Sequence, residues 1–248
     1  MRERRESRVT ITFDGVEVDA RLGDSVLETA RRVGVSIPSL CFLEGLSVWG
    51  GCRLCVVEVA EDHRLRPACA TTVAADMEIL VDTPQLRAYR KAILELLFAE
   101  GNHVCAVCVS NGNCELQDMA VQCGMDHVRY DQQAPVRQVD ASHPKYVFDP
   151  NRCILCTRCV RVCHEIEGAH VWDIAERGAS AELVTELNKP WGEAASCTWC
   201  GKCVAVCPTG SLFYQGSAVG EMQHSTSMIK ILAAARNEGE WLDPRSPV

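Results

Sequence analysis

The sequence predicts an α+β protein made of several small domains, and three observations lead to this fold class. Apolar runs at 8–13 and 16–20 flank Asp14-Gly15, a strong signal for a two-residue hairpin turn. Residues 84–99 repeat apolar side chains at helical spacing. Cys accounts for 16 of 248 residues, whereas aromatic residues make up only 6%. We therefore expect metal-bound cysteines, rather than large apolar side chains, to organise much of the interior.

Composition narrows the class of protein and its compartment. A formal net charge of −8 argues against nucleic-acid binding. Residues 1–15 are charged and lack an apolar core segment, so no secretory leader is expected, and no apolar run approaches the ~18 residues of a membrane span. These features predict a cytoplasmic protein, and in that reducing compartment many cysteines indicate metal rather than disulfides.

Residues 7–82 predict a small β-rich domain. A short amphipathic helix at about 25–33 follows the hairpin, and a strand is expected at 56–60. Four cysteines with the spacing C-x10-C-x2-C-x13-C suit one 2Fe–2S cluster, in a hairpin–helix–loop setting that resembles a ferredoxin, although the first gap is longer than in plant-type ferredoxins. Zinc is the alternative. The expected ligands are Cys41, Cys52, Cys55 and Cys69.

Residues 83–125 combine the helix at 84–99 with three closely spaced cysteines, namely Cys105, Cys108 and Cys114. A 4Fe–4S cluster bound there needs a fourth ligand. His103 is the nearest candidate, and Cys123, on a helix predicted to begin at 115, is its competitor. Closeness in sequence favours His103, and Cys123 would then be a small buried apolar residue.

Residues 144–216 contain two runs with the spacing C-x2-C-x2-C-x3-C, which is the pattern of bacterial two-cluster ferredoxins. In that pattern the fourth Cys of each run enters a helix and binds the cluster of the other run. One 4Fe–4S cluster should therefore take Cys153, Cys156, Cys159 and Cys207, and the other Cys197, Cys200, Cys203 and Cys163. A zinc site needs four ligands, and neither run divides into two pairs. Iron–sulfur binding is thus strongly favoured.

The remaining segments carry weaker signals. Residues 126–150 are polar and rich in Pro, which predicts a linker, and the insert at 164–196 is expected to add strands. His170 is expected to be structural, because all eight thiolate positions are filled. The tail at 217–248 shows a helical pattern at 227–236. No dinucleotide-binding, phosphate-binding or nucleophile motif is present, so we expect no substrate-converting site in this chain.

Four stretches carry a resemblance to known proteins, at residues 98–108, 112–120, 151–163 and 166–172. This order of cysteine groups resembles the N-terminal part of the large iron–sulfur subunit of respiratory complex I, and the front of some iron-only hydrogenases and NAD-linked formate dehydrogenases. The chain ends about forty residues after its last Cys. It is therefore most similar to the small diaphorase (gamma) subunits of soluble NAD-reducing nickel–iron hydrogenases. One departure is that His103 lies two residues before the first Cys, whereas complex I has three residues between them.

The resemblance implies one 2Fe–2S and three 4Fe–4S clusters, with a β-grasp domain at 7–82 and a His/Cys3 domain at 83–125. It implies that NAD and FMN bind a diaphorase partner subunit, and that electrons pass through this chain to the small and large hydrogenase subunits, where H2 is split. The N-terminal clusters would face the flavin partner, and the two ferredoxin-type clusters the hydrogenase. The alternatives are the equivalent subunit of a formate dehydrogenase or complex I-like enzyme and, more distantly, a zinc-stabilised interaction module.

Overall fold

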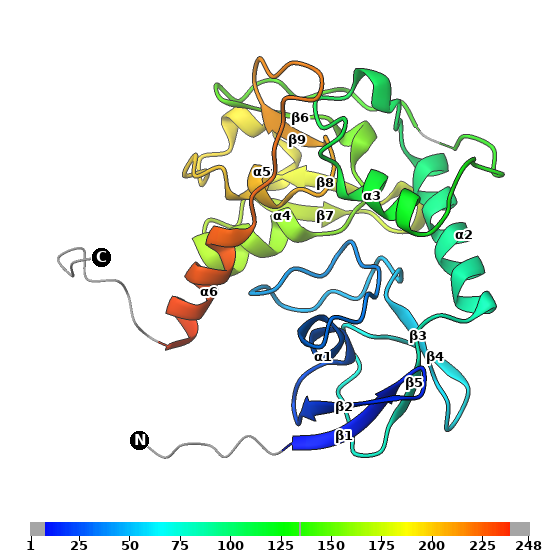
Figure 1. Ribbon diagram of the computed structural model, residues 1–248. Helices are drawn as coiled ribbons and strands as arrows, with labels where there is room; N and C mark the ends of the chain where they lie inside the picture. The colour runs from blue at the N-terminus through cyan, green and yellow to red at the C-terminus, as the bar shows by residue number, and fades with distance from the viewer. Residues whose placement is uncertain (1–7, 134, 239–248) are drawn as a thin grey trace. The chain divides into compact units, whose positions relative to one another are not determined.

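The computed structural model describes residues 8–133 and 135–238 (Figure 1). The predictions for residue 7 and for residues 239–248 of the tail lie outside this part. The chain divides into two compact units. The first contains residues up to Phe42, Val48–Leu96 and Asp118–Tyr130, and the second contains Leu43–Ser47, Leu97–Gln117 and the residues from Asp131 onward.

The first unit is built on a five-stranded sheet of order β2-β1-β5-β3-β4. Its strands are β1 (Arg8–Phe13), β2 (Val16–Arg21), β3 (Val56–Val59), β4 (Arg64–Pro67) and β5 (Glu78–Leu80). β1 and β5 are parallel, and the other neighbours are antiparallel. The predicted hairpin is confirmed, because Asp14 and Gly15 both have positive φ (48° and 81°), as this two-residue turn requires.

Helix α1 (Val26–Arg32) packs on this sheet. Ser25 and Glu28 form a capping box at its N-terminus, in which each side chain bonds the other residue's backbone N–H. Val26 and Leu27 are fully buried, and they share an apolar core with sheet residues such as Ile11 and Ile79.

Helix α2 (Pro84–Glu100) is close to the predicted bounds of 84–99, and its residues up to Leu96 belong to the first unit. Within this unit it holds the segment 118–130 through two ion pairs. Lys91 Nζ lies 2.8 Å from Asp126 Oδ1, and Arg129 Nε lies 2.7 Å from Glu95 Oε2. The fully buried Glu95 makes the second pair the better shielded of the two. Helix α3 (Glu115–Gln122) begins at the predicted residue.

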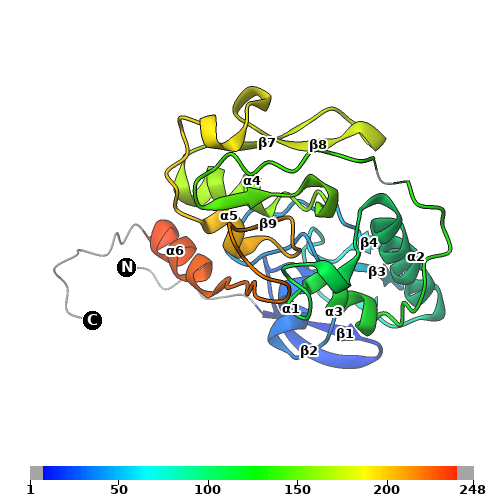
Figure 2. The ribbon, with the colours of Figure 1, turned by 90° about the horizontal axis from the view of Figure 1, so that it is seen from above.

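The second unit contains two antiparallel strand pairs. These are β6 (Tyr146–Phe148) with β9 (Leu212–Tyr214), and β7 (Trp172–Ala175) with β8 (Glu182–Thr185), the latter side by side in Figure 2. The expected strands of the insert are thus present. The linker prediction for 126–150 is wrong at residues 146–148, which form β6: three consecutive buried apolar side chains lie there.

Short helices connect these strands. They are α4 (Arg158–Arg161), the π-helix η3 (Val162–Glu167), α5 (Lys202–Val206), and the 3₁₀ turns η1 (Cys105–Val107), η2 (Pro150–Arg152), η4 (Gly178–Ser180), η5 (Glu186–Asn188) and η6 (Trp191–Glu193). Among the predicted fourth cysteines, Cys163 lies on η3, whereas Cys207 comes just after α5 in extended conformation. Only the first run therefore has its fourth Cys inside a helix.

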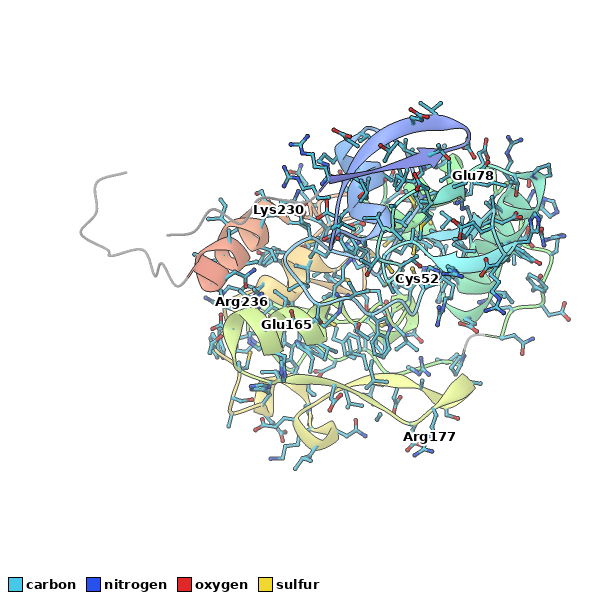
Figure 3. All side chains as sticks on the ribbon, turned by 90° about the horizontal axis from the view of Figure 1, so that it is seen from below. Cys52, Glu78, Glu165, Arg177, Lys230 and Arg236 are labelled. Atoms are coloured by element: carbon cyan, nitrogen blue, oxygen red, sulfur yellow. The ribbon has the colours of Figure 1, made fainter. Side chains whose placement is uncertain are left out.

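Helix α6 (Ser227–Glu238) contains the helix predicted at 227–236. It buries Ile229 and Ala233, and a Cβ on Gly45 would lie 2.8 Å from the Ala233 Cβ, so the segment 43–47 passes close to the helix. Arg236 Nη1 donates to the backbone carbonyl of Glu165 on η3 (3.2 Å, Figure 3). No helix of the described residues has the length and apolar character needed to cross a membrane.

Candidate iron–sulfur sites

The structure brings together the four cysteines predicted as 2Fe–2S ligands in the first unit. Cys41 donates its backbone N–H to the sulfur of Cys52 (3.4 Å; Cys52 is labelled in Figure 3). The thiols of Cys41, Cys55 and Cys69 hydrogen-bond to one another through Cys69. The thiol of Cys41, together with burial, raises the pKa of Cys52, and hydrogen bonding to Cys69 lowers the pKa of Cys55 to about 7. Four thiols linked pairwise in this way suit a group that binds several thiolates.

A glycine shapes the loop that precedes Cys52. A Cβ on Gly51 would lie 2.1 Å from Nε1 of Trp49, so the indole ring lies directly over the backbone of residue 51. Only Gly allows this approach. The half-exposed Trp49 ring thus packs against the loop that carries Cys52 and Cys55.

In the second unit, His103 and three cysteines line one cavity with about 290 Å³ of space between protein atoms. The cysteines are Cys105, Cys108 and Cys114. Burial raises the pKa of the Cys114 thiol to about 11. Burial and the nearby Arg152 lower the pKa of His103 to about 4, which keeps its imidazole neutral at pH 7. Nε2 of His103 is buried and has no hydrogen-bond partner. A neutral ring with a free nitrogen fits a metal ligand.

The competitor Cys123 belongs to the first unit. It lines a cavity of the first unit together with Asp82, Arg87 and Arg90, and it is not among the residues around His103. Burial raises the pKa of its thiol. Within the second unit, the structure groups His103 with the three cysteines.

The sulfur of Cys108 rests on the backbone of Gly210. A Cβ at Gly210 would lie 2.5 Å from Cys108 Sγ. Any side chain at position 210 would displace this thiol.

A second cavity, of about 340 Å³, is lined by the first predicted ferredoxin-type set: Cys153, Cys156, Cys159 and Cys207. Its other walls are largely apolar, with Leu155, Ile174 and Leu212. Burial raises the pKa of Cys153 to about 12 and of Cys156 to about 11. The backbone N–H of Leu155, a residue with a positive φ of 51°, donates to Cys153 Sγ (3.4 Å). Thiols with pKa values this high stay protonated at pH 7 unless a metal binds them.

A third cavity, of about 310 Å³, is lined by the other predicted set: Cys163, Cys197, Cys200 and Cys203. Aromatic rings form much of its wall, namely Tyr146, Trp172, Trp191 and Trp199. The backbone N–H of Val171 donates to Cys163 Sγ (3.3 Å). Cys200 is exposed, so this cavity reaches the surface of its unit. Each run thus contributes its fourth Cys to the cavity of the other run, as the spacing predicts.

The cavities of the second unit lie next to one another. Thr209 lines both the His103 cavity and the Cys153 cavity. The Cys153 and Cys163 cavities are built on the same two helical segments. The segment α4–η3 supplies Cys159 to the first cavity and Cys163 to the second. The helix α5 supplies Cys203 to the second cavity, and the residue after it, Cys207, lines the first. Within the described residues, no three His, Cys, Asp or Glu side chains are grouped so that they could hold a single metal ion.

Sequence reasoning missed His143. This buried ring has its Nε2 4.0 Å from Cys197 Sγ, and the two residues are 54 positions apart. Burial, with the charge of Lys145, lowers the pKa of His143. No motif marks this residue, because the contact depends on the tertiary fold. His170, by contrast, lies against His164 (Nδ1–Nδ1 2.7 Å) and lines none of the three cavities.

Three family models match the chain in succession. Residues 6–84 match a 2Fe-2S iron-sulfur cluster binding domain, residues 90–129 the NADH-ubiquinone oxidoreductase-G iron-sulfur binding region, and residues 144–213 the ferredoxin-like domain of NADH-quinone oxidoreductase subunit 3. The three matched ranges contain all sixteen cysteines. The chain therefore consists largely of 2Fe–2S and 4Fe–4S binding domains.

Individual relatives identify the family more narrowly than the domain models do. The gamma subunit of the NAD-reducing hydrogenase HoxS from Cupriavidus necator is 33% identical over 205 residues, which are 82% of this chain and 86% of that subunit. The chain belongs to this gamma-subunit family. A chain in the crystal structure of NAD+-reducing NiFe-hydrogenase in the H2-reduced state has the same fold, with a TM-score of 0.80 and 35% identity over 85% of this chain and 88% of that chain.

The family extends to larger proteins. The G 2 subunit of the NADH-quinone oxidoreductase of Rhizobium meliloti is 38% identical over 209 residues, which are 83% of this chain but 24% of that protein. The chain thus spans about a quarter of the length of this relative.

Proposed function

We propose that this chain relays single electrons between a diaphorase subunit, which binds NAD and FMN, and the small and large subunits of a nickel–iron hydrogenase. The complex would interconvert H2 and NAD+ with H+ and NADH. The observation that carries the proposal is the set of three adjacent cavities in the second unit, each lined by four of the expected ligands. The three sets of ligands are alike in number and type, which suits three groups of one kind.

The assigned side chains would hold one 2Fe–2S cluster in the first unit and one 4Fe–4S cluster in each of the three cavities. When bound, such clusters supply one-electron carriers whose potential depends on hydrogen bonds and exposure. The chain's own contribution is to hold the thiolates, to exclude water with apolar walls and to place the sites next to one another. The unpartnered Nε2 of His103 supports this residue as the fourth ligand of its cavity.

The finer layout of the chain belongs to the same proposal. We expect a β-grasp 2Fe–2S domain at 7–82, a His/Cys3 domain at 83–125, a two-cluster ferredoxin-like domain at 144–216 and a helical tail at 217–248. The five-stranded sheet with α1 supports the first of these. None of the sixteen cysteines forms a disulfide, which supports a reducing compartment such as the cytoplasm.

An assay on the native complex tests this function. The complex is isolated anaerobically through a tag on this chain, and NAD+ reduction is measured with H2 and, separately, with formate. We expect H2-dependent reduction that is lost in Cys156→Ser and kept in Cys123→Ser, a matched cysteine outside the assigned sites. NAD+ reduction with formate alone would show that the catalytic partner is a formate dehydrogenase and not a hydrogenase. A colourless protein that contains zinc would overturn the proposal.

The similarity to the NADH-quinone oxidoreductase protein of Rhizobium meliloti favours one alternative, a complex I-like enzyme. In that case the tagged complex would be brown and would oxidise NADH, but it would reduce NAD+ with neither H2 nor formate.

A further inference from the structure

His143 is a buried histidine of the second unit, 1% exposed, just ahead of β6. Three aromatic rings surround it, with centroid distances of 4.7 Å to Tyr146, 4.9 Å to Trp191 and 5.0 Å to Trp199. All three rings also line the cavity of Cys163, Cys197, Cys200 and Cys203. The imidazole is therefore part of the packing directly around that cavity.

The hydrogen bonds of the ring fix where its proton lies. The backbone N–H of Lys145 donates to Nδ1 of His143 (3.1 Å). Because a backbone N–H can only donate, Nδ1 must be the unprotonated nitrogen, and the neutral ring carries its proton on Nε2. Nε2 is the atom that faces Cys197 Sγ, at 4.0 Å.

We infer that His143 donates a hydrogen bond from Nε2–H to the sulfur of Cys197, and thereby raises the reduction potential of the 4Fe–4S cluster at this site. The inference rests on the proposed function, which places the cluster in this cavity. A reduced cluster carries one more negative charge than an oxidised one, so a donor to its sulfur stabilises the reduced form more. His143 would act on the cluster only through the Cys197 sulfur, as a positioning residue.

The ring is held in place by its loop, independently of any cluster. Asp140 accepts hydrogen bonds from the backbone N–H of Trp191 (2.6 Å) and from Ser142. A Cβ on Gly192 would lie 2.4 Å from the Ser142 carbonyl oxygen, so this close approach requires Gly. A hydrogen-bond donor that is fixed by such contacts does not have to reorganise when the charge of the cluster changes.

The neighbouring cavity of Cys153 has hydroxyl groups, rather than an imidazole, near its sulfurs. The hydroxyls of Thr209 and Ser211 lie there, but each donates its proton to a backbone carbonyl at 2.9 Å. Backbone N–H donors to a cysteine sulfur occur at both cavities, so they do not separate the two sites. The ring of His143 is therefore a donor that the Cys153 cavity lacks, and it should make the cluster in the Cys163 cavity easier to reduce than it would be without the ring.

A redox titration of the intact complex tests this. His143→Phe keeps an aromatic ring but removes the donor, and His143→Gln restores an N–H. The signal of this site is identified by its loss in Cys200→Ser. We expect about a ten-fold lower ratio of reduced to oxidised cluster at a fixed potential in His143→Phe, equivalent to about 59 mV for a one-electron couple. His143→Gln should recover part of the shift, and the 2Fe–2S signal should not move.

The control is His127→Phe, which removes an exposed imidazole of the first unit and should leave the potential of this cluster unchanged. An unshifted cluster in His143→Phe, at normal iron content, would overturn the inference while leaving the proposed function intact. If His143→Phe does not assemble the cluster, pulsed EPR of the wild-type complex with ¹⁵N-labelled histidine tests the hydrogen bond directly. A ¹⁵N coupling at the signal that is lost in Cys200→Ser supports the hydrogen bond, and the absence of this coupling overturns it. A complex without any 4Fe–4S signal would instead refute the proposed function.

Discussion

Glu115 and Arg158 form a two-pronged ion pair, with Nη1–Oε1 and Nη2–Oε2 distances of 2.6 and 2.8 Å. Glu115 directly follows Cys114 of the His103 cavity, and Arg158 lies between Cys156 and Cys159 of the next cavity. The backbone N–H of Glu115 also donates to the carbonyl of Pro208 (2.9 Å). The walls of two adjacent candidate cluster sites are thus joined by one residue of α3.

Glu115→Gln should destabilise the second unit, because it removes the charge that faces a guanidinium only 2% exposed. We expect a loss of about 2 kcal/mol in the free energy of unfolding, within the range for hydrogen bonds to charged groups. Anaerobic urea unfolding measures this. Asp118→Asn changes an exposed carboxylate of the same helix and serves as the control, and equal stability of the two variants would contradict the prediction.

Gly210→Ala should remove one 4Fe–4S cluster selectively. The added Cβ would lie 2.5 Å from Cys108 Sγ, so the thiol must leave its position. We expect loss of most of the EPR signal from the His103 site, together with about 1–3 kcal/mol of overpacking cost. Ser217→Ala, a small change on the other side of β9, should keep the full signal. A normal cluster content in Gly210→Ala would show that Cys108 is not held as described.

His103→Ala and Cys123→Ala together test the fourth ligand of this site. The first should alter or abolish one 4Fe–4S signal and leave the 2Fe–2S signal, because it removes the only imidazole among the described residues that line the cavity. The second should change neither signal. Iron content and EPR spectra of both proteins measure the outcome, and the reverse pattern would assign the ligand to Cys123.

Local signals in the sequence predicted the local structure well. Asp14-Gly15 indicated the hairpin, and the apolar spacing indicated α2 and α3 to within a residue or two. The cysteine spacing also predicted which thiols line each cavity, because that spacing is itself a consequence of how a loop and a short helix surround a cluster.

Features that depend on the tertiary fold could not be predicted in this way. β6 is only three residues long and forms by pairing with β9, more than sixty residues away. The contacts of His143 with Cys197 and of Gly210 with Cys108 likewise join distant positions. A single sequence carries no local pattern for such pairs, because neither residue changes the periodicity around it.

Arg90 of α2 is a further residue of this kind, and its replacement should weaken the 2Fe–2S site. Its guanidinium is 5% exposed, and Nη1 and Nη2 donate to the carbonyls of Val81 and Val56, each at 2.8 Å. Val56 directly follows Cys55, so this contact fixes the backbone beside an expected ligand. Arg90→Met would leave two carbonyls without a donor, at a cost of about 1–3 kcal/mol for each.

Arg87→Met is the matched control on the same helix. Arg87 is exposed and paired with Asp82, and exposed pairs contribute about 0–1 kcal/mol. We expect Arg90→Met, and not Arg87→Met, to lower the urea midpoint of the first unit and to speed the loss of the 2Fe–2S absorption to a chelator. If both variants release iron at the wild-type rate, the Val56 contact does not stabilise the site, and the buried guanidinium serves only to join α2 to the sheet.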